Sequence, residues 1–504
     1  MDKQVAELSG TIESILTGAG TLLPELLLTG FFLLLVTLDL FKSATIKRLL
    51  PWLALTGLFA TLIIQILGGY TTEGVQFLNL LRSDGLSRYA GILFSAVGIF
   101  TILLSLHNNP LRKLKQGRGE YYGLILLLVV GLNLMVKSVN LLMVFMAIEV
   151  VSVASYILTL ILKENKSSVE AALKYVLYGT LSAGVMLYGM SFFYGLTGSL
   201  DYTTVEFWQR LLEADTLMVT VAAILVFAGF FFKISAAPFH FWVSDVYQGA
   251  PMPVVALFST GPKIAGVIVI LRFIAVFADP VLTDSFGDIL TFLGIATLST
   301  LAVGNFTALL QKSPRRLMAY SSIAHAGFLL MGLLAFGTDY TFSLLFYMTV
   351  LVFMNFGIFL FLQLSEDEFK INTIADFAGL GKVYPFISIL ALIYLISLTG
   401  LPPLAGFMGK LLIFSNVWEA WSMSGNSMLL VLLVTGVLLT GVALFYYIKI
   451  PYYLFLKGNL REENLVISLS NKLLLGLFAL PLLILFFKPD LLLQWIEHIL
   501  AQTL

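Results

Sequence analysis

Four ionisable side chains stand inside runs of sequence that are otherwise apolar enough to cross a membrane: Glu149, Lys233, Lys263 and Lys410. Placing such a group at the centre of a membrane helix costs about 2.5–3.5 kcal/mol on insertion scales, so these residues are expected to face a bundle interior and mark an ion pathway. Ammonium groups repel metal cations. The chemistry that this set supports is therefore proton transfer rather than metal binding.

Lys233 is well placed to load and release a proton. It lies in the middle of its run, just before a break expected at Pro238. Burial favours the neutral amine of a lysine, whereas a nearby carboxylate favours the ammonium, so the proton is exchanged when the partner moves. Glu149 is the candidate partner. The alternatives are a fixed structural ion pair for Glu149 and, for Lys410 on the outer part of its span, extension to the membrane interface.

Two further candidates have equally good structural explanations. Lys174 fits a lysine that reaches the cytoplasmic surface and pairs with Glu170 at i, i+4 as well as it fits a proton carrier. His325 is a candidate relay because imidazole titrates near neutral pH, and the alternative is a neutral histidine that donates to a backbone carbonyl. His240 is expected to be structural, and Glu25 to mark a membrane interface.

The composition excludes several classes of protein. Of the 504 residues, 59% are hydrophobic and 12% are charged, against about 25% charged in an average soluble protein, so no soluble surface can be built. The net charge of zero argues against binding nucleic acid. The absence of cysteine excludes disulfides, thiolate zinc sites and cysteine-bound iron–sulfur clusters. With only four histidines as well, we expect no cofactor and no metal in this chain.

The elements that position the charged residues are expected to be membrane helices. A bilayer core needs about 20 apolar residues per helix, and about fourteen runs qualify. These runs lie near 22–41, 49–68, 86–106, 121–136, 139–162, 169–195, 217–248, 252–276, 286–310, 316–336, 342–364, 384–414, 428–456 and 471–488. The leader before the first run lacks the basic start and small-residue cleavage site of a secretory signal, so the first run is kept as a helix.

Two of these spans are expected to break into half-helices, at Pro238 and at Pro402-Pro403. Proline removes a backbone donor and clashes with the preceding turn. Such breaks at membrane depth are tolerated where they line a polar cavity, and a matching pair is typical of inverted-repeat transporters. The breaks lie five spans apart, which predicts two five-helix repeats of opposite topology. The predicted division is helices 1–3 in 1–120, repeats in 121–276 and 286–456, and a last helix in 471–504.

The basic residues predict the orientation in the membrane. Alternate connections hold 18 of the 29 lysines and arginines, the other connections and both ends hold 7, and 4 lie inside spans. Cytoplasmic loops carry the excess of basic residues. Both termini are therefore expected on the outer face.

Several motifs resemble the antiporter-like subunits of respiratory complex I, the proton-pumping NADH–quinone oxidoreductase. They are FKISAAPFHFWVSDVYQGAP at 232–251, EAALKY at 170–175, AYSSIAH at 319–325 and GLPPLAGF at 400–407. The form DVYQGAP is similar to the bacterial subunit N rather than to subunits L or M, and the resemblance covers about residues 15–490.

The resemblance implies an all-α membrane protein of fourteen helices with inverted repeats of helices 4–8 and 9–13. It pairs Glu149 with Lys233 and matches Lys263 and Lys410 to the lysines of helices eight and twelve. It implies proton pumping in a bacterial inner membrane, coupled to electron transfer from NADH to quinone through FMN and iron–sulfur clusters on other subunits. Subunits M, J and K are the expected membrane neighbours, and the redox arm is reached through them. The alternative is a subunit of a multi-subunit sodium/proton antiporter that shares the fold.

Overall fold

The computed structural model describes residues 18–501 except 42, 69–74, 78, 115, 279–281, 283, 284, 337–339 and 459–466, so the leader expected before the first helix lies outside the described residues. The N-terminal elements are η1 (Gly20–Leu22), α2 (Leu23–Asp39), α3 (Ala44–Leu67), β1 (Val75–Gln76), β2 (Leu81–Arg82), α4 (Gly85–Leu106) and α5 (Asn109–Arg112). The next set is α6 (Arg118–Lys137), α7 (Leu141–Leu160), α8 (Lys166–Thr197), α9 (Val205–Glu213), α10 (Thr216–Ile234), α11 (Val243–Gly249), α12 (Met252–Ile274) and η2 (Ala275–Ala278).

The remaining elements are again almost all helical. They are α14 (Gly287–Leu310), α15 (Pro314–Leu333), α16 (Tyr340–Asp367), η3 (Ile374–Phe377), α17 (Leu380–Val383), α18 (Pro385–Thr399), α19 (Ala405–Ser424), α20 (Ser427–Tyr447), α21 (Lys449–Pro451), η4 (Tyr452–Leu456), α22 (Leu469–Phe487) and α23 (Asp490–Ala501). Several spans begin at a side-chain cap, which satisfies backbone donors that the first turn leaves free. The capping residues include Asp84, Asn140, Asn165, Asp215 and Asn426.

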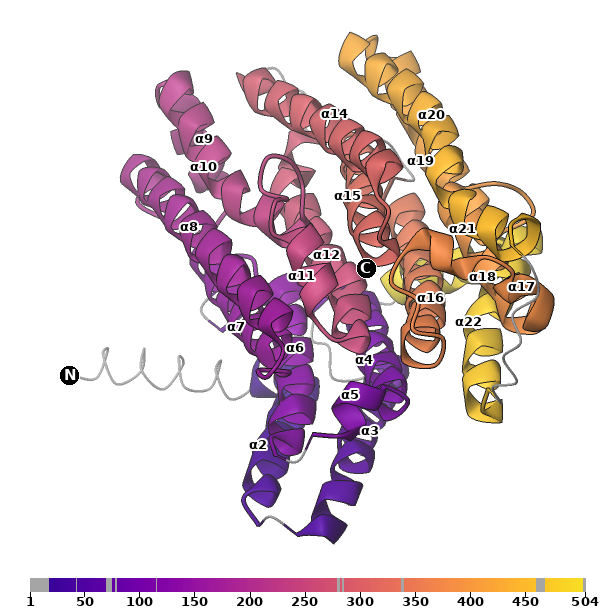
Figure 1. The fold of residues 1–504 in the computed structure, drawn as a ribbon. Coiled ribbons are helices and arrows are strands. Elements are labelled where there is room, and N and C mark those ends of the chain that lie inside the picture. The colour runs from indigo at the N-terminus through magenta and orange to yellow at the C-terminus, as the bar shows by residue number, and fades with distance from the viewer. Residues whose placement is uncertain are drawn as a thin grey trace.

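The predicted all-α membrane class is confirmed. Within the described residues, twelve helices are long and apolar enough to cross a membrane. The other two predicted spans coincide with α15 and with the pair α18 and α19, of which α18 has 15 residues. The count of fourteen spans therefore stays a prediction. The bundle appears in Figure 1, where α8 and α10 lie on one side and α19 and α20 on the other.

Both predicted breaks are present. The span at 217–248 divides into α10 and α11, and the span at 384–414 divides into α18 and α19. In each case the first half ends at a residue in the left-handed conformation, Ser235 (φ 64°) and Gly400 (φ 84°). Each break also contains a cis X–Pro peptide. The two breaks thus place free helix ends inside the bundle, where the charged residues lie.

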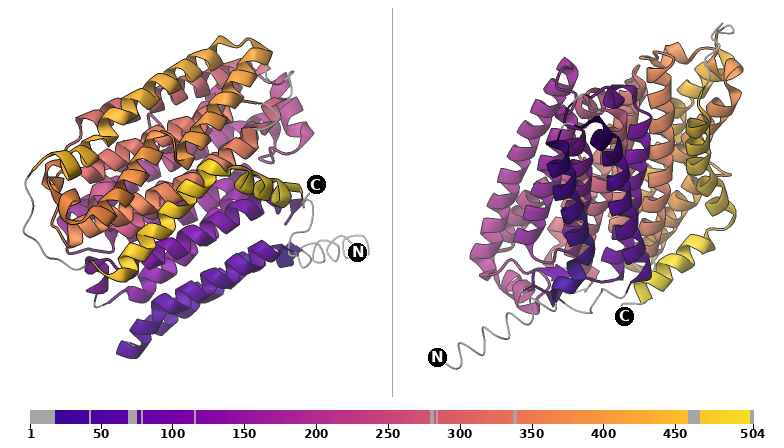
Figure 2. Two further views of the ribbon diagram at one scale, coloured as in Figure 1. Left: turned by 90° about the vertical axis from the view of Figure 1, so that its right-hand side faces the viewer. Right: turned by 90° about the horizontal axis from the view of Figure 1, so that it is seen from below.

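Two helices form the centre of the molecule. The most apolar stretch of α12 is completely buried, and that of α16 is 94% buried. They contact each other and α15, and α12 also contacts α10. Figure 2 shows the long helices running side by side. The two broken spans lie against this central pair, because α10 contacts α12 and both α18 and α19 contact α16. Lys263 on α12 and His325 on α15 therefore lie in the protein interior.

Several short elements were not predicted from hydropathy. α9 is short and amphipathic, and β1 pairs with β2 as an antiparallel two-residue ladder. α23 is a 12-residue amphipathic helix that packs against α4 and α16. The ring of its Trp495 lies 5.3 Å from the ring of Tyr89. Because these elements are too short to span a bilayer, a search for 20-residue apolar runs passes over them.

Candidate functional site

The three mid-span lysines are buried. The exposed fraction is 2% for Lys233 and 3% for both Lys263 and Lys410. Extension of Lys410 to the membrane interface, the alternative left open by the sequence, is therefore excluded. Glu149 is only half-buried. Each of these three lysines must therefore find its hydrogen-bond partners within the protein.

Lys233 is held by a side chain of the neighbouring span. Its Nζ donates to Ser152 Oγ at 3.0 Å, and that hydroxyl donates in turn to the Ile148 carbonyl at 2.7 Å. Glu149 interacts electrostatically with Lys233. Among the described residues, however, the ion pairs within 4 Å do not include Glu149. The carboxylate is a neighbouring charge rather than a fixed partner.

Lys263 is bound by the helix that carries the histidine. Its Nζ donates to the carbonyl oxygen of Ser322 at 2.9 Å and to the hydroxyl of Ser322 at 2.6 Å. The hydroxyl of Tyr247 on α11 lies 2.9 Å from the same Ser322 oxygen. A cavity of about 10 Å³ separates Lys263 from His325, and Asn355 of α16 also lines it. That volume is about the least that holds one water molecule.

His325 is bonded to two tyrosine hydroxyls. Its Nδ1 lies 2.6 Å from the Tyr347 hydroxyl, and its Nε2 lies 3.1 Å from the Tyr447 hydroxyl, which also bonds Ser321. The alternative of a histidine bonded to a backbone carbonyl is therefore wrong. A tyrosine hydroxyl both donates and accepts, so it leaves either ring tautomer open. Lys263 and Lys410 both act electrostatically on this ring.

Lys410 lies at the second break. Its Nζ donates to the carbonyl oxygen of Thr399, the last residue of α18, at 2.9 Å. The ammonium also stands 4.4 Å from the centre of the Phe328 ring, within range of a cation–π interaction. Gly400 packs directly against the aliphatic stem of this lysine. The Phe328 ring belongs to α15, so Lys410 contacts the helix that carries His325.

Lys174 differs from the other lysines. Its Nζ pairs with Glu170 at 2.6 Å, as the i, i+4 spacing suggested, and also with Asp245 of α11 at 2.9 Å. Arg316 pairs with the other oxygen of Asp245 at 2.8 Å. The Lys174 side chain is 39% exposed. Its contacts fit the ion-paired surface lysine, and its part in a proton pathway stays a prediction.

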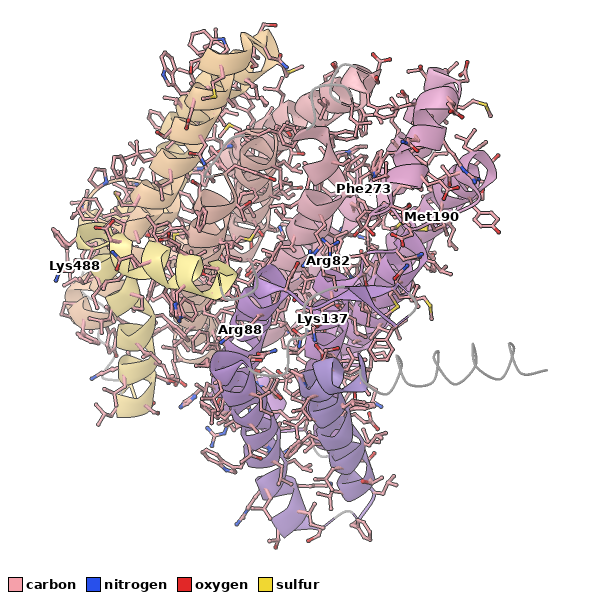
Figure 3. The ribbon with its side chains drawn as sticks, turned by 180° about the vertical axis from the view of Figure 1, so that it is seen from behind. Arg82, Arg88, Lys137, Met190, Phe273 and Lys488 are labelled. Carbon is pink, nitrogen blue, oxygen red and sulfur yellow. The ribbon has the colours of Figure 1, made fainter. Side chains whose placement is uncertain are left out.

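Two ion pairs, one buried and one partly buried, were not predicted from the sequence. Glu25, which was expected to mark a membrane interface, is 4% exposed and pairs with Lys137 at 2.7 Å. Arg272 forms a two-armed contact with Asp84 at 2.6 and 2.8 Å and donates to the Val136 carbonyl. Figure 3 labels Lys137 and Arg82 at this end, where Leu81 and Ser138 form a β-bridge. Because these residues lie near the ends of their spans, their positions in the sequence did not indicate that they form ion pairs.

The last candidate residue from the sequence is His240. His240 is 8% exposed, and its ring stacks on Phe241 with 4.4 Å between the centres, which suits the structural role expected of it. Among the described residues, no group of three or more histidine, aspartate or glutamate side chains is arranged to hold a metal ion.

The chain matches one protein family over residues 138–441, the family described as NADH:quinone oxidoreductase/Mrp antiporter, TM. It is 37% identical to a protein of Chloroherpeton thalassium named NADH-quinone oxidoreductase subunit N 2, over 96% of this chain and 95% of the relative. It is 35% identical to NADH-quinone oxidoreductase subunit N of Chlorobium chlorochromatii, over 96% and 94% of the two chains.

One solved structure superimposes on nearly the whole length of this chain. A chain of respiratory complex I from Thermus thermophilus superimposes with a TM-score of 0.75 at 28% identity, covering 94% of this chain and 99% of that one. A chain of the Mrp complex from Dietzia sp. has a TM-score of 0.80 at 19% identity, covering 97% of each chain. At that identity the second likeness concerns the fold alone.

Proposed function

The chain belongs to the NADH:quinone oxidoreductase/Mrp antiporter membrane family, and we propose that it is the subunit-N-type, proton-translocating membrane subunit of an NADH–quinone oxidoreductase. The observation that carries this proposal is the set of three buried lysines that donate to hydroxyls and carbonyls inside the bundle. Neutral residues would insert more cheaply at these depths, so a proton-carrying role accounts for the charges.

The proton pathway in this proposal runs along the set Glu149, Lys174, Lys233, Lys263, His325 and Lys410. Lys233 exchanges its proton when the distance to Glu149 changes, because that carboxylate is not fixed to it. Lys263 and His325 exchange through the water-sized cavity between them. Lys410 then passes protons toward the outer face. In this proposal Lys174, which pairs with Glu170 and Asp245, is at the cytoplasmic edge of the path.

The rest of the proposal concerns setting and partners. The repeats are 121–276 and 286–456, and the charge asymmetry places both termini on the outer face. Subunits M, J and K are the proposed neighbours within the membrane. FMN, iron–sulfur clusters and quinone belong to other subunits. Moving one charge against 100 mV costs about 2.3 kcal/mol, so pumping here depends on electron transfer in the redox arm.

Proton-to-electron stoichiometry in inverted membrane vesicles tests the proposal. In the assembled complex, Lys233→Ala and Glu149→Ala are expected to lower the number of protons pumped per NADH oxidised, because each removes one charge of the exchanging pair. Lys113→Ala and Glu368→Ala remove exposed charges of the same type and serve as controls. Unchanged stoichiometry in both test variants would refute the assignment. Sodium-dependent proton movement without NADH oxidation would favour the antiporter alternative.

A further inference from the structure

Arg315, the second residue of α15, joins three helices. Its Nη1 donates to the carbonyl oxygens of Tyr247, Gln248 and Ala250 at 3.2, 3.1 and 2.8 Å. Its Nε and Nη2 donate to the two carboxylate oxygens of Glu366 at 2.6 and 2.5 Å. One guanidinium therefore ties the start of α15 to the end of the half-helix α11 and to the end of α16.

The end of α11 needs such a partner. The last carbonyls of a helix have no partner within it, so those of α11, which ends at Gly249, need donors from elsewhere in the protein. A guanidinium carries five N–H donors in a rigid fork, so it serves these carbonyls and a carboxylate at once. A lysine cannot reproduce this contact because its single ammonium is a point charge without that fork.

Tyr247 is held by α15 at both of its ends. Its carbonyl oxygen accepts from Arg315, and its hydroxyl lies 2.9 Å from the Ser322 hydroxyl. Ser322 follows Arg315 by seven residues, which is about two helical turns, so both face the same side of α15. The Tyr247 ring is fully buried and packs against the ring of Phe359. The tyrosine therefore has little freedom to move independently of α15.

Ser322 is also the residue that holds Lys263. The same Ser322 hydroxyl accepts from the Lys263 ammonium at 2.6 Å. A connected set of contacts thus runs from Arg315 through Tyr247 and Ser322 to Lys263. At the Arg315 end, this set of contacts borders a cavity of about 110 Å³ that Gln248, Arg315 and Glu366 help to line. That volume has room for several water molecules.

We propose that Arg315 is a positioning residue for proton exchange at Lys263, acting through Tyr247 and Ser322. The guanidinium fixes the end of α11, the end of α11 fixes the Tyr247 hydroxyl, and that hydroxyl holds Ser322 in the geometry that accepts from the lysine. The inference rests on the proposed function, in which Lys263 carries protons. It adds that the broken half-helix of the first repeat is set by a side chain of the second.

The test measures the initial rate of NADH-driven proton uptake by inverted vesicles, normalised to the amount of assembled complex. Arg315→Gln is expected to lower this rate about threefold to tenfold, since small displacements of a reacting group cost large factors in rate. Arg315→Lys keeps a charge beside Glu366 and is expected to show the same fall if the glutamine variant does not assemble. Arg210→Gln is the matched control, because Arg210 also binds a glutamate and a carbonyl, Glu206 and Thr197, at the other end of the bundle.

Two further comparisons separate positioning from loss of structure. Tyr247→Phe removes only the hydroxyl and is expected to lower the rate as Arg315→Gln does, while the double variant falls no further than the worse single one. Ser322→Ala is expected to lower the rate, and Ser322→Thr, which keeps a hydroxyl, to restore most of it.

The outcomes distinguish this inference from the function on which it rests. If Lys263→Met pumps normally, the proposed function fails. If Lys263→Met abolishes the contribution of this subunit while Tyr247→Phe pumps at the wild-type rate, only the positioning inference fails. Effects of Arg315→Gln and Tyr247→Phe that multiply would also overturn it, because the two residues would then act independently.

Discussion

The two broken spans hold their lysines in different ways. At the first break, Lys233 precedes the interruption, and its ammonium donates to the Ser152 hydroxyl with Glu149 nearby. At the second break, Lys410 follows the interruption, and its ammonium donates to the Thr399 carbonyl that ends α18. One lysine is held by side chains of another helix, and the other is held by the main chain of its own broken span.

This difference determines what each break requires of the sequence. The last carbonyls of a helix carry partial negative charge, so a main-chain partner suits a cation directly. The Lys410 ammonium reaches this carbonyl because the lysine stem packs closely against the backbone. Gly400 allows that packing, since it has no Cβ beside the stem and adopts φ 84°. The first break has Ser235 at the corresponding left-handed position. We therefore expect the second break to depend on a glycine and the first on exchangeable side chains.

Gly400→Ala should have the largest effect. An added Cβ would lie 2.6 Å from Lys410 Cδ, and the left-handed conformation costs an L-residue about 1–2 kcal/mol. The lysine stem must then move away from Thr399, so we expect a fall in proton pumping of about tenfold and a lower thermal midpoint of the assembled complex. Gly441→Ala is the control, since no heavy atom lies within 4 Å of its added Cβ. Equal behaviour of the two variants would contradict the comparison.

Ser152→Ala should have an intermediate effect. It removes the hydroxyl acceptor of Lys233, while Glu149 still acts on the ammonium, so the expected loss is about 1 kcal/mol, or about fivefold in pumping rate. Ser155→Ala is a matched control because Ser155, like Ser152, donates to the carbonyl four residues earlier but holds no lysine. Proton uptake by vesicles is the measurement. A greater loss of pumping rate in Ser155→Ala than in Ser152→Ala would show that the hydrogen bond between Ser152 and Lys233 is not what sustains pumping at the first break.

Ser235→Gly should have the smallest effect and the opposite sign. The left-handed conformation costs an L-residue about 1–2 kcal/mol, and the greater chain entropy of glycine offsets about 0.5–1 kcal/mol of that gain. We therefore expect the free energy of unfolding to rise by about 0.5–1 kcal/mol. The Ser235 hydroxyl is buried without a hydrogen-bond partner among the described residues, so its loss is cheap. Ser235→Ala removes the hydroxyl but keeps the strained conformation. A thermal midpoint raised by the alanine variant as much as by glycine would mean that the hydroxyl, not the backbone, is responsible.

Part of the site could be predicted because its physical signals are local. The cost of a buried charge places Lys233, Lys263 and Lys410 inside the bundle whatever the neighbouring helices are. The chemistry of proline likewise predicts a break at Pro238 from the residues around it. These predictions needed no knowledge of which helix packs against which.

The missing part depends on contacts between distant segments. Among the described residues, the hydrogen bonds that connect Tyr247 to Lys263 pass through Ser322, and that connection requires the register of α11 against α15. Most of these spans are apolar on every side, so the pattern of hydrophobic residues does not say which face meets protein. For the same reason, the pairing of Glu25 with Lys137 could not be predicted from the sequence.

The buried pair of Glu25 and Lys137 has a consequence for synthesis of the protein. The two residues are 112 positions apart, and translation proceeds at about 5–20 residues per second. The carboxylate of the first span therefore emerges roughly 6–22 seconds before the ammonium that neutralises it in the folded protein. During that interval the Glu25 carboxylate lacks the partner that it has in the folded protein. The contact between α2 and α6 through this ion pair is thus made only after α6 has been synthesised.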